Sequence, residues 1–540
     1  MYVMPPPPPA GMGFRMPMFK AFVPEALRPW IYVLGAFCFQ FSSGFYLGAM
    51  EDIQGSTNFM IEDVLMCLYA NLAAMAVYFP LLFRLKFRFS NRDLLCTAAI
   101  VVAACNIAVL HTTNMPLLWL ICFISGMAKL QGTFEHISNI QQWITPKRDF
   151  GVFFPVLHII LLTSIECSGF LAAWFGYHFT WEMMHYFTVF TMMCVVLVQM
   201  TCCVPFCPMP KPLSLKGIDF WGGAVMSVTM LMVSYIALYG DYKMWTDNRE
   251  LCILSGFVLI LTAYLAYRFA NINNPYISPK VFTSKNVLAI WAAIILAELL
   301  LGCEHTVEEI LYAEVYDLEE ITKEQLKLWA MPGIYFGILF SLAWLAWWKF
   351  KVWKLLATGY ICIAVYTLSF YFLIDVNINI EQFRVPIMFR GAAYAILSIA
   401  LMWSLQQTLK DLEHFFMGLS VFNIFHMYLA GAIGYAIYST LFNHFLNDDI
   451  SRYGASLTIT GIDISHFDFA AYMDSFIRSQ MSVAAKQIYG IVSWAAIFTS
   501  ALFLLLDIPA IRNRFSSIPT WYSVGLSALK KLRAIAIVKR

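Results

Sequence analysis

Residues 117–175 read LLWLICFISGMAKLQGTFEHISNIQQWITPKRDFGVFFPVLHIILLTSIECSGFLAAWF. They form two long apolar segments that are joined by the short polar link ITPKRD at 144–149. A helix needs about 20 mostly apolar residues to cross the hydrocarbon core of a bilayer. Each segment is therefore predicted to be a membrane span.

Ionisable side chains lie inside both segments: Lys129 and Glu135 in the first, and Glu166 in the second. A charge at the bilayer centre costs roughly 2.5–3.5 kcal/mol on insertion scales, so such side chains usually face a cavity or one another. If the two helices are antiparallel neighbours, Lys129 and Glu166 reach a similar depth near the midplane. We predict that they can pair there, either as a fixed structural contact or as a moving part of a mechanism.

The composition of the whole chain is that of a membrane protein. Apolar residues make up 60% of the chain and charged residues 13%, against roughly 45–50% and 25% in a soluble domain. The net charge of +2 gives no sign of a nucleic-acid partner. The 13 cysteines are mostly scattered, and the group Cys202, Cys203 and Cys207 has neither a CxxC nor a Cys/His spacing. No metal site and no cofactor are therefore predicted.

Apolar segments of spanning length recur along the chain with short polar breaks between them. Helices are predicted rather than barrel strands, because the segments are continuously apolar and do not alternate. The first runs from about 29 to 50, and the others are centred near residues 74, 102, 128, 164, 193, 229, 260, 297, 340, 364, 396, 427 and 498. These segments predict an all-α integral membrane protein with fourteen spans.

The distribution of basic residues predicts the orientation. With the N-terminus in the cytoplasm, the cytoplasmic loops hold most of the 35 Lys and Arg residues, and the C-terminus is cytoplasmic as well. The acidic stretch 304–327 then falls outside and is expected to be a solvated loop with a short helix. The longest outer loop, 441–487, is a candidate docking surface for a partner.

Several short motifs carry a resemblance to one transporter family. The stretch 85–95, LKFRFSNRDLL, matches a basic loop of that family at Arg88 and Arg92. Further matches are Pro146 with Arg148, Ser168 to Ala173 with Trp181, Asp219 with Gly222, Gly240 with Trp245, and Pro275 with Phe282 and Asn286. From about Phe39 to Asp507 the chain resembles the fourteen-helix major facilitator transporters of the EmrB/QacA drug:proton antiporter type.

The resemblance implies the domain organisation. Two six-helix bundles would be separated by two extra central helices. The expected boundaries are a proline-rich cytoplasmic tail at 1–28, the first bundle at 29–206, the inserted helices and linkers at 207–284, the second bundle with the outer loop 441–487 at 285–510, and a basic cytoplasmic tail at 511–540.

The resemblance also implies which helices line the central cavity. Lys129 and Glu135 lie on the fourth helix, Glu298 on the ninth and Arg390 on the twelfth. Arg88 and Arg92 would form the loop that gates the conformational change. The family's acidic residue in the first helix corresponds to Ser42, and its fourth-helix arginine to Cys122. Proton coupling therefore uses other carboxylates, or the protein is an uncoupled divergent carrier.

Glu298 is the first choice for a coupling residue. It has no basic neighbour within a helical turn, and a carboxylate alone in apolar surroundings takes up a proton readily. A structural hydrogen bond to a neighbouring helix is the alternative. Glu135 is expected near the cytoplasmic end in contact with water. Arg390 is expected to extend toward the outer face.

The sequence thus predicts a secondary transporter that exports amphipathic or hydrophobic organic compounds in exchange for protons. The alternative is a membrane-embedded enzyme that acts on lipid-like substrates, but no nucleophile motif, phosphate loop or metal cluster supports it. The resemblance implies the inner membrane of a bacterium as the location. It also implies a periplasmic adaptor and an outer-membrane channel as candidate partners.

Overall fold

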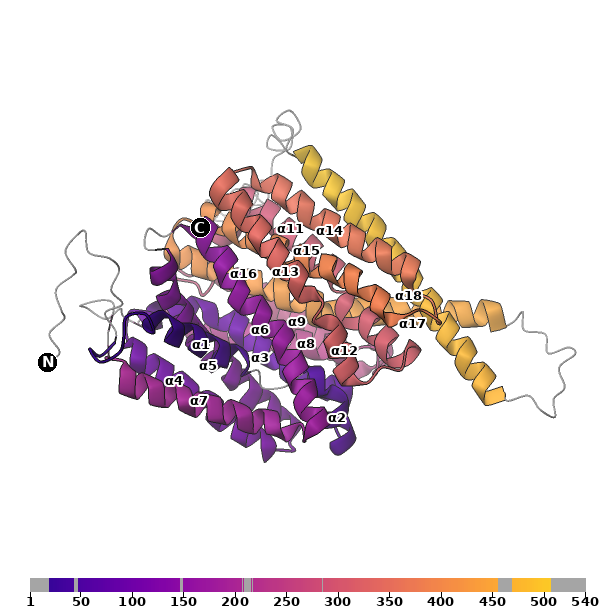
Figure 1. The fold of residues 1–540 in the computed structure, drawn as a ribbon, viewed down its shortest axis with the longest axis horizontal. Helices are drawn as coiled ribbons and strands as arrows, with labels where there is room; N and C mark the ends of the chain where they lie inside the picture. Colours follow the sequence, from indigo (N-terminus) through magenta and orange to yellow (C-terminus); the bar gives the residue numbers. More distant parts are fainter. Residues whose placement is uncertain are drawn as a thin grey trace, which may run out of the picture.

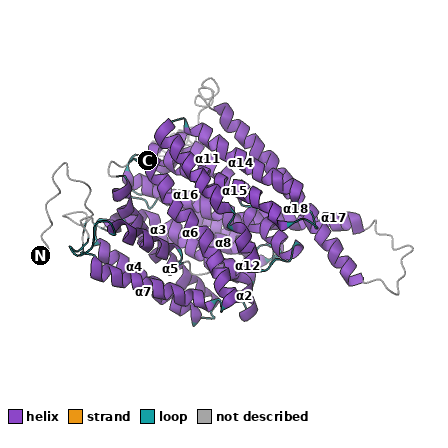
Figure 2. Ribbon diagram, in the orientation of Figure 1, coloured by secondary structure: helices purple, strands orange, loops and turns teal. Residues whose placement is uncertain are grey.

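The computed structural model describes residues 19–42, 47–145, 149–205, 207, 215, 217–283, 285–454 and 469–506. The described chain is helical almost throughout (Figures 1 and 2). Within it, the only extended pairing is a single bridge between Phe19 and Cys203. The prediction of an all-α protein is confirmed.

We call the chain up to Cys202 the first half. Its helices are α1 (Arg28–Gln40), η1 (Leu47–Ala49), α2 (Met50–Ser56), α3 (Ile61–Lys86), α4 (Asn91–Leu110), α5 (Met115–Ile144), α6 (Phe150–His178) and α7 (Glu182–Cys202). The inserted helices that follow are α8 (Phe220–Tyr239), η2 (Trp245–Asp247), α9 (Arg249–Asn271) and α10 (Lys280–Thr283).

We call the chain from Lys285 the second half. Its helices are α11 (Lys285–Leu301), η3 (Glu304–Glu308), η4 (Leu311–Val315), α12 (Glu320–Lys327), α13 (Ala330–Leu342), η5 (Ala343–Trp348), α14 (Val352–Leu373), η6 (Ile380–Phe383), α15 (Arg384–Thr408), α16 (Leu412–Met427), η7 (Tyr428–Ala432), α17 (Ile433–Gly454) and α18 (Phe469–Leu506).

Thirteen helical segments of the described residues are long and apolar enough to cross a membrane. Each coincides with one of the predicted spans after the first. The predicted first span, 29–50, consists of the 13-residue helix α1 and then η1 and α2, with residues 43–46 outside the described chain. Length and apolar character are therefore enough to locate the spans.

Polar side chains mark where several spans begin. The Asn114 side chain accepts a hydrogen bond from the Leu117 amide at 3.3 Å, and Asp149 accepts one from the Gly151 amide at 2.9 Å. Asp219 does the same for Gly222 at 2.9 Å. These caps satisfy amides that have no partner inside the helix, so each polar break in the sequence also starts the next helix.

The two halves lie side by side in Figure 1, the first in indigo to magenta and the second in coral to yellow. They meet where α3 packs against α16 and where α6 packs against α12, α13 and α15. Among the inserted helices, α8 packs against α3, whereas α9 packs mainly against α8 and has few buried residues. The ionisable groups of the site lie along the contact between the halves.

Two segments differ from the loops that were expected. Residues 304–315 continue α11 as the π-helical turns η3 and η4, and α12 leads into α13. Most of the described part of 441–487 is also helical, because α17 ends at Gly454 and α18 begins at Phe469. The 38 residues of α18 extend over about 57 Å at 1.5 Å per residue, so this hairpin projects beyond the bundle (Figure 1).

Three predicted features fall outside the described residues. They are most of the proline-rich tail 1–28, the link that holds Pro146 and Arg148, and the basic tail 511–540.

Candidate functional site

Glu298 on α11 begins a chain of three hydrogen-bonded side chains. Its Oε1 lies 2.6 Å from Nδ1 of His426 on α16, and Nε2 of that imidazole lies 2.7 Å from the hydroxyl of Tyr394 on α15. The Glu298 side chain is only 7% exposed. Within the described structure its second oxygen, Oε2, has no hydrogen-bond partner. Glu298 has no basic neighbour on its own helix, but His426 of a neighbouring helix gives it the hydrogen bond that was the alternative interpretation of the sequence.

Arg390 on α15 is at the centre of a second group of buried side chains. Its Nη1 lies 2.6 Å from Oε2 of Glu308, and its Nη2 lies 3.2 Å from Oε1 of Glu304. The hydroxyls of Tyr312 and Tyr366 also donate hydrogen bonds to Glu308. The Arg390 side chain is 2% exposed, so the expectation that it extends to the outer surface is wrong. The buried carboxylate of Glu308 and the half-buried carboxylate of Glu304 hold it inside the protein.

The π-helical turns of η3 explain how both carboxylates reach Arg390. A π-helix closes i to i+5 hydrogen bonds, so its turn is wider than that of an α-helix and residues four or five apart stack on one face. Glu304 and Glu308 both lie in η3. The sequence prediction missed both residues because an acidic stretch is typical of solvated loops.

A third group, around Lys327 on α12, joins the halves. Lys327 forms ion pairs with Glu309 and with Glu324, the latter at 2.7 Å. On the same helix, Lys323 pairs with Glu51 of α2 in the first half. The amide of Glu51 also donates a hydrogen bond to Glu320 at 2.7 Å. These contacts close the end of the molecule that is predicted to face outward.

Glu166 on α6 faces the second half. Its electrostatic neighbours there are Arg390, Lys327, Glu304 and Glu324. One turn further on, a Cβ on Gly169 would lie only 2.3 Å from Oε2 of Glu324, so the glycine permits this close approach. Glu166 thus joins Glu304, Glu308, Glu309 and Glu324 in a set of five carboxylates that lie around Arg390 and Lys327.

The predicted ion pair between Lys129 and Glu166 does not form. Lys129 on α5 is 5% exposed and buried, but Glu166 has no ion pair with it in the described structure. The reason is the packing of α6, which lies mainly against α12, α13 and α15 rather than against α5. The Glu166 side chain consequently faces the second half.

Glu135 on α5 is completely buried rather than in contact with water as expected. Its Oε2 lies 2.9 Å from Nζ of Lys86, and its Oε1 accepts a hydrogen bond from Gln131 at 3.3 Å. Nζ of Lys86 also donates to Ser138 at 2.6 Å. Both partners of this pair lie within the first half, on α3 and α5.

The predicted gate loop lies between α3 and α4. Arg92 pairs with the adjacent Asp93 at 3.5 Å, and the Arg88 guanidinium lies 5.7 Å from the centre of the Phe89 ring. The contact to the second half comes instead from Arg84, whose Nη2 lies 2.9 Å from Oε1 of Glu413 at the start of α16. This ion pair closes the end of the molecule that is predicted to be cytoplasmic.

No arrangement of three or more His, Cys, Asp or Glu side chains in the described chain could hold a metal ion. The ionisable groups described above come from both halves, and such side chains can form ion pairs and exchange protons.

No protein-family model matches the sequence, and no curated protein matches it. The fold is similar to that of solved transporters. A crystal structure of tetrameric PepTSo2 is 10% identical, with 90% of this chain and 99% of that chain covered and a TM-score of 0.55. A peptide transporter, POT, in complex with sulfate is 12% identical, with 90% and 97% covered and a TM-score of 0.51.

A mutant of the nucleoside transporter NupG is 11% identical, with 89% of this chain and 99% of that chain covered and a TM-score of 0.51. At these sequence identities the similarity establishes the fold only, and the function must be inferred from the residues of the site. The chain has the major facilitator fold, as predicted.

Proposed function

We propose that this protein is a proton-coupled secondary transporter that exports amphipathic or hydrophobic organic compounds. The observation that carries the proposal is the excess of carboxylates over basic side chains where the two halves meet, with Glu308 and Glu324 buried and the others half-buried. Glu166, Glu304, Glu308, Glu309 and Glu324 lie around Arg390 and Lys327, and Lys323 is a further basic neighbour of Glu309. Uncompensated charge is costly in a low dielectric, so such a site favours the uptake of protons.

Glu298 is the proposed carrier of the coupled proton. A proton on its carboxylate can pass to the imidazole of His426 through the 2.6 Å contact, and the Tyr394 hydroxyl extends the path at 2.7 Å. The three residues come from α11, α16 and α15. A movement of these helices during transport would break the path and commit the proton to one side.

The contacts between the halves supply two gates for alternating access. Arg84–Glu413 closes the predicted cytoplasmic end, and Lys323–Glu51 closes the predicted outer end. Beside the first pair, the rings of Phe83 and Phe134 lie 5.9 Å and 5.3 Å from that of Phe416. In this proposal one gate opens while the other stays closed.

We also propose a location and partners for the protein. The protein would lie in the inner membrane of a bacterium with both termini in the cytoplasm. The hairpin of α17 and α18 would then project outward, which suits the docking of a periplasmic adaptor connected to an outer-membrane channel.

Transport in proteoliposomes tests the function. Protein is reconstituted with an imposed pH gradient, and the uptake or release of amphipathic fluorescent dyes, beginning with ethidium, is followed. Wild-type protein should move dye in response to the gradient, and Glu298→Gln should lose this response while keeping exchange of dye without a gradient. The control is Glu135→Gln, which removes a carboxylate outside the proposed path; because it also breaks the buried pair with Lys86, rates are compared per amount of monodisperse protein.

Two results would count against the proposal. Gradient-driven transport by Glu298→Gln at the normal rate would show that another residue couples the proton. Dye movement by wild-type protein that never responds to pH would show an uncoupled carrier.

A further inference from the structure

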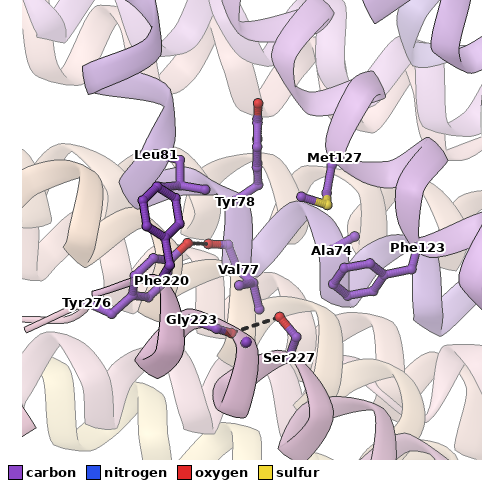
Figure 3. A pocket seen from close by; sticks show the side chains of 11 residues that line it. Ala74, Val77, Tyr78, Leu81, Phe123, Met127, Phe220, Gly223, Ser227 and Tyr276 are labelled. Atoms are coloured by element: carbon purple, nitrogen blue, oxygen red, sulfur yellow. Dashed lines mark hydrogen bonds between the residues drawn. The ribbon is translucent and has the colours of Figure 1, made fainter. Parts of the chain in front are cut away.

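A cavity of about 170 Å³ lies beside α8, and its lining holds no charged side chain (Figure 3). Its walls are formed by α3, α5 and α8 together with Tyr276. None of these lining residues belongs to the helices of the second half, which begin at Lys285. A molecule carried between the two halves would therefore not occupy this cavity.

The walls of the cavity leave little for a polar ligand to bind. The Tyr276 hydroxyl donates to the carbonyl oxygen of Val77 at 2.6 Å, and Ser227 donates to that of Gly223 at 2.9 Å. The Tyr78 hydroxyl donates to Gln131 at 3.2 Å and is directed away from the other lining groups (Figure 3). Each hydroxyl proton already has an acceptor within the protein, so the ligand must be apolar.

The size and the position of the cavity further restrict the kind of ligand that could bind. An engineered apolar cavity of about 150 Å³ in another protein takes up benzene, so this one has room for a short length of alkyl chain. Phe220 at its edge is 55% exposed, and the neighbouring Trp221 is 61% exposed. Both lie on a membrane-spanning helix, so the chain would enter from the surrounding lipid.

A polar crevice of about 520 Å³ continues the site beyond the first turn of α8. It is lined by Asp219, Arg268 and the three asparagines at 271, 273 and 274. Nη2 of Arg268 lies 2.7 Å from Oδ1 of Asp219. The backbone of Tyr276, which also lines the apolar cavity, forms a hydrogen bond with the same carboxylate. The crevice and the cavity therefore adjoin at Asp219 and Tyr276.

We propose that these two cavities together bind one glycerophospholipid of the surrounding membrane. Part of an acyl chain fills the apolar cavity between α3, α5 and α8, and the headgroup lies over the crevice around Asp219 and Arg268. The lipid fills a gap in the surface by which α8 packs on α3. Since α9 packs mainly on α8, the lipid stabilises the attachment of both inserted helices.

Photocrosslinking in vesicles tests the proposal. The full-length protein is reconstituted in phosphatidylethanolamine and phosphatidylglycerol vesicles that contain a phospholipid with a diazirine in one acyl chain, and the labelled peptides are mapped. In wild-type protein the label should be concentrated in the segments 74–81, 123–127 and 220–227. Ala224→Phe should abolish this concentration, because the new ring occupies the cavity.

The matched control is Val228→Phe, one turn further along the same exposed face of α8 and outside the lining. It should label like wild type. If Ala224→Phe does not yield monodisperse protein, the smaller change Ala224→Leu serves the same purpose.

Two results would overturn the proposal. Labelling spread evenly over all lipid-facing helices, and unchanged by Ala224→Phe, would show that the cavity holds no lipid. Displacement of the label by excess ethidium in wild-type protein would assign the cavity to transported amphiphiles instead.

Discussion

The stability of the protein is expected to depend strongly on the pairing of Arg390 with Glu308. Its guanidinium is 2% exposed and pairs with Glu308, which is completely buried. Removal of one partner from such a pair leaves an uncompensated charge and costs about 3–5 kcal/mol, whereas removal of both costs much less. The pair is therefore better tested by a double change than by either single change.

At this scale we expect strong coupling between Arg390 and Glu308. Arg390→Met and Glu308→Gln should each lower the unfolding temperature of the purified protein in detergent, and the double variant should recover part of the loss. The control is a second double-mutant cycle with Lys129→Met and Glu166→Gln, because the structure does not pair these two residues with each other. Their effects should add to within about 0.5 kcal/mol. Additive losses for the first cycle, or strong coupling in the second, would contradict the observed pairing.

The sequence located these residues within spans but could not identify their partners. Glu166, Glu298 and Arg390 all lie in long apolar helices, as predicted. Their partners depend on how each helix is rotated about its axis. Helices that are apolar on every side give no periodic signal of that rotation. His426 lies 128 residues from Glu298, so no local pattern could connect them, and their functional roles remain predictions.

At the scale of elements, glycines allow α13 and α15 to approach closely. A Cβ on Gly333 would lie 1.8 Å from the carbonyl oxygen of Met388, and one on Gly391 would lie 2.3 Å from that of Ala330. The two glycines thus face the backbone of the opposite helix. Close packing of small residues is a common means of association between membrane helices, and the Pro332–Gly333 pair serves this packing.

Gly333→Ala should accordingly destabilise the protein by about 1–3 kcal/mol, the usual range for overpacking. The expected result is a lower unfolding temperature in detergent. The control is Gly256→Ala on α9, where an added Cβ would meet no atom within 4 Å. That variant should be neutral or slightly stabilising, since alanine favours helix. Equal effects of the two changes would contradict the close approach of α13 and α15.

The spans could be predicted because a bilayer demands long apolar helices. The segment 304–315 could not, since its glutamates resemble a solvated loop in the sequence. Two of its carboxylates pair with Arg390 and Lys327, which come from other elements of the fold. The helical hairpin of α17 and α18 was missed for a different reason. The part that extends beyond the membrane has no long apolar segment from which a helix could be predicted.

At the scale of the whole molecule, ion pairs join the two halves at both ends of the contact between them. Arg84–Glu413 and Lys323–Glu51 lie at opposite ends of the spans, and the carboxylate-rich site lies between them. A transporter with this arrangement must release one ion pair at a time. Both partners of Arg84–Glu413 are partly exposed, and such pairs contribute only about 0–1 kcal/mol, so this ion pair can break without a large cost.

In the proposed mechanism, Glu298 exchanges a proton when the organic substrate binds. The most direct measurement is proton release by purified protein in weakly buffered detergent solution, followed with a pH indicator as a transported dye is added. Wild-type protein should release protons on binding. Glu298→Gln should bind the dye, measured by its fluorescence, and release none, whereas Glu135→Gln should match wild type. Undiminished proton release by Glu298→Gln would contradict the account.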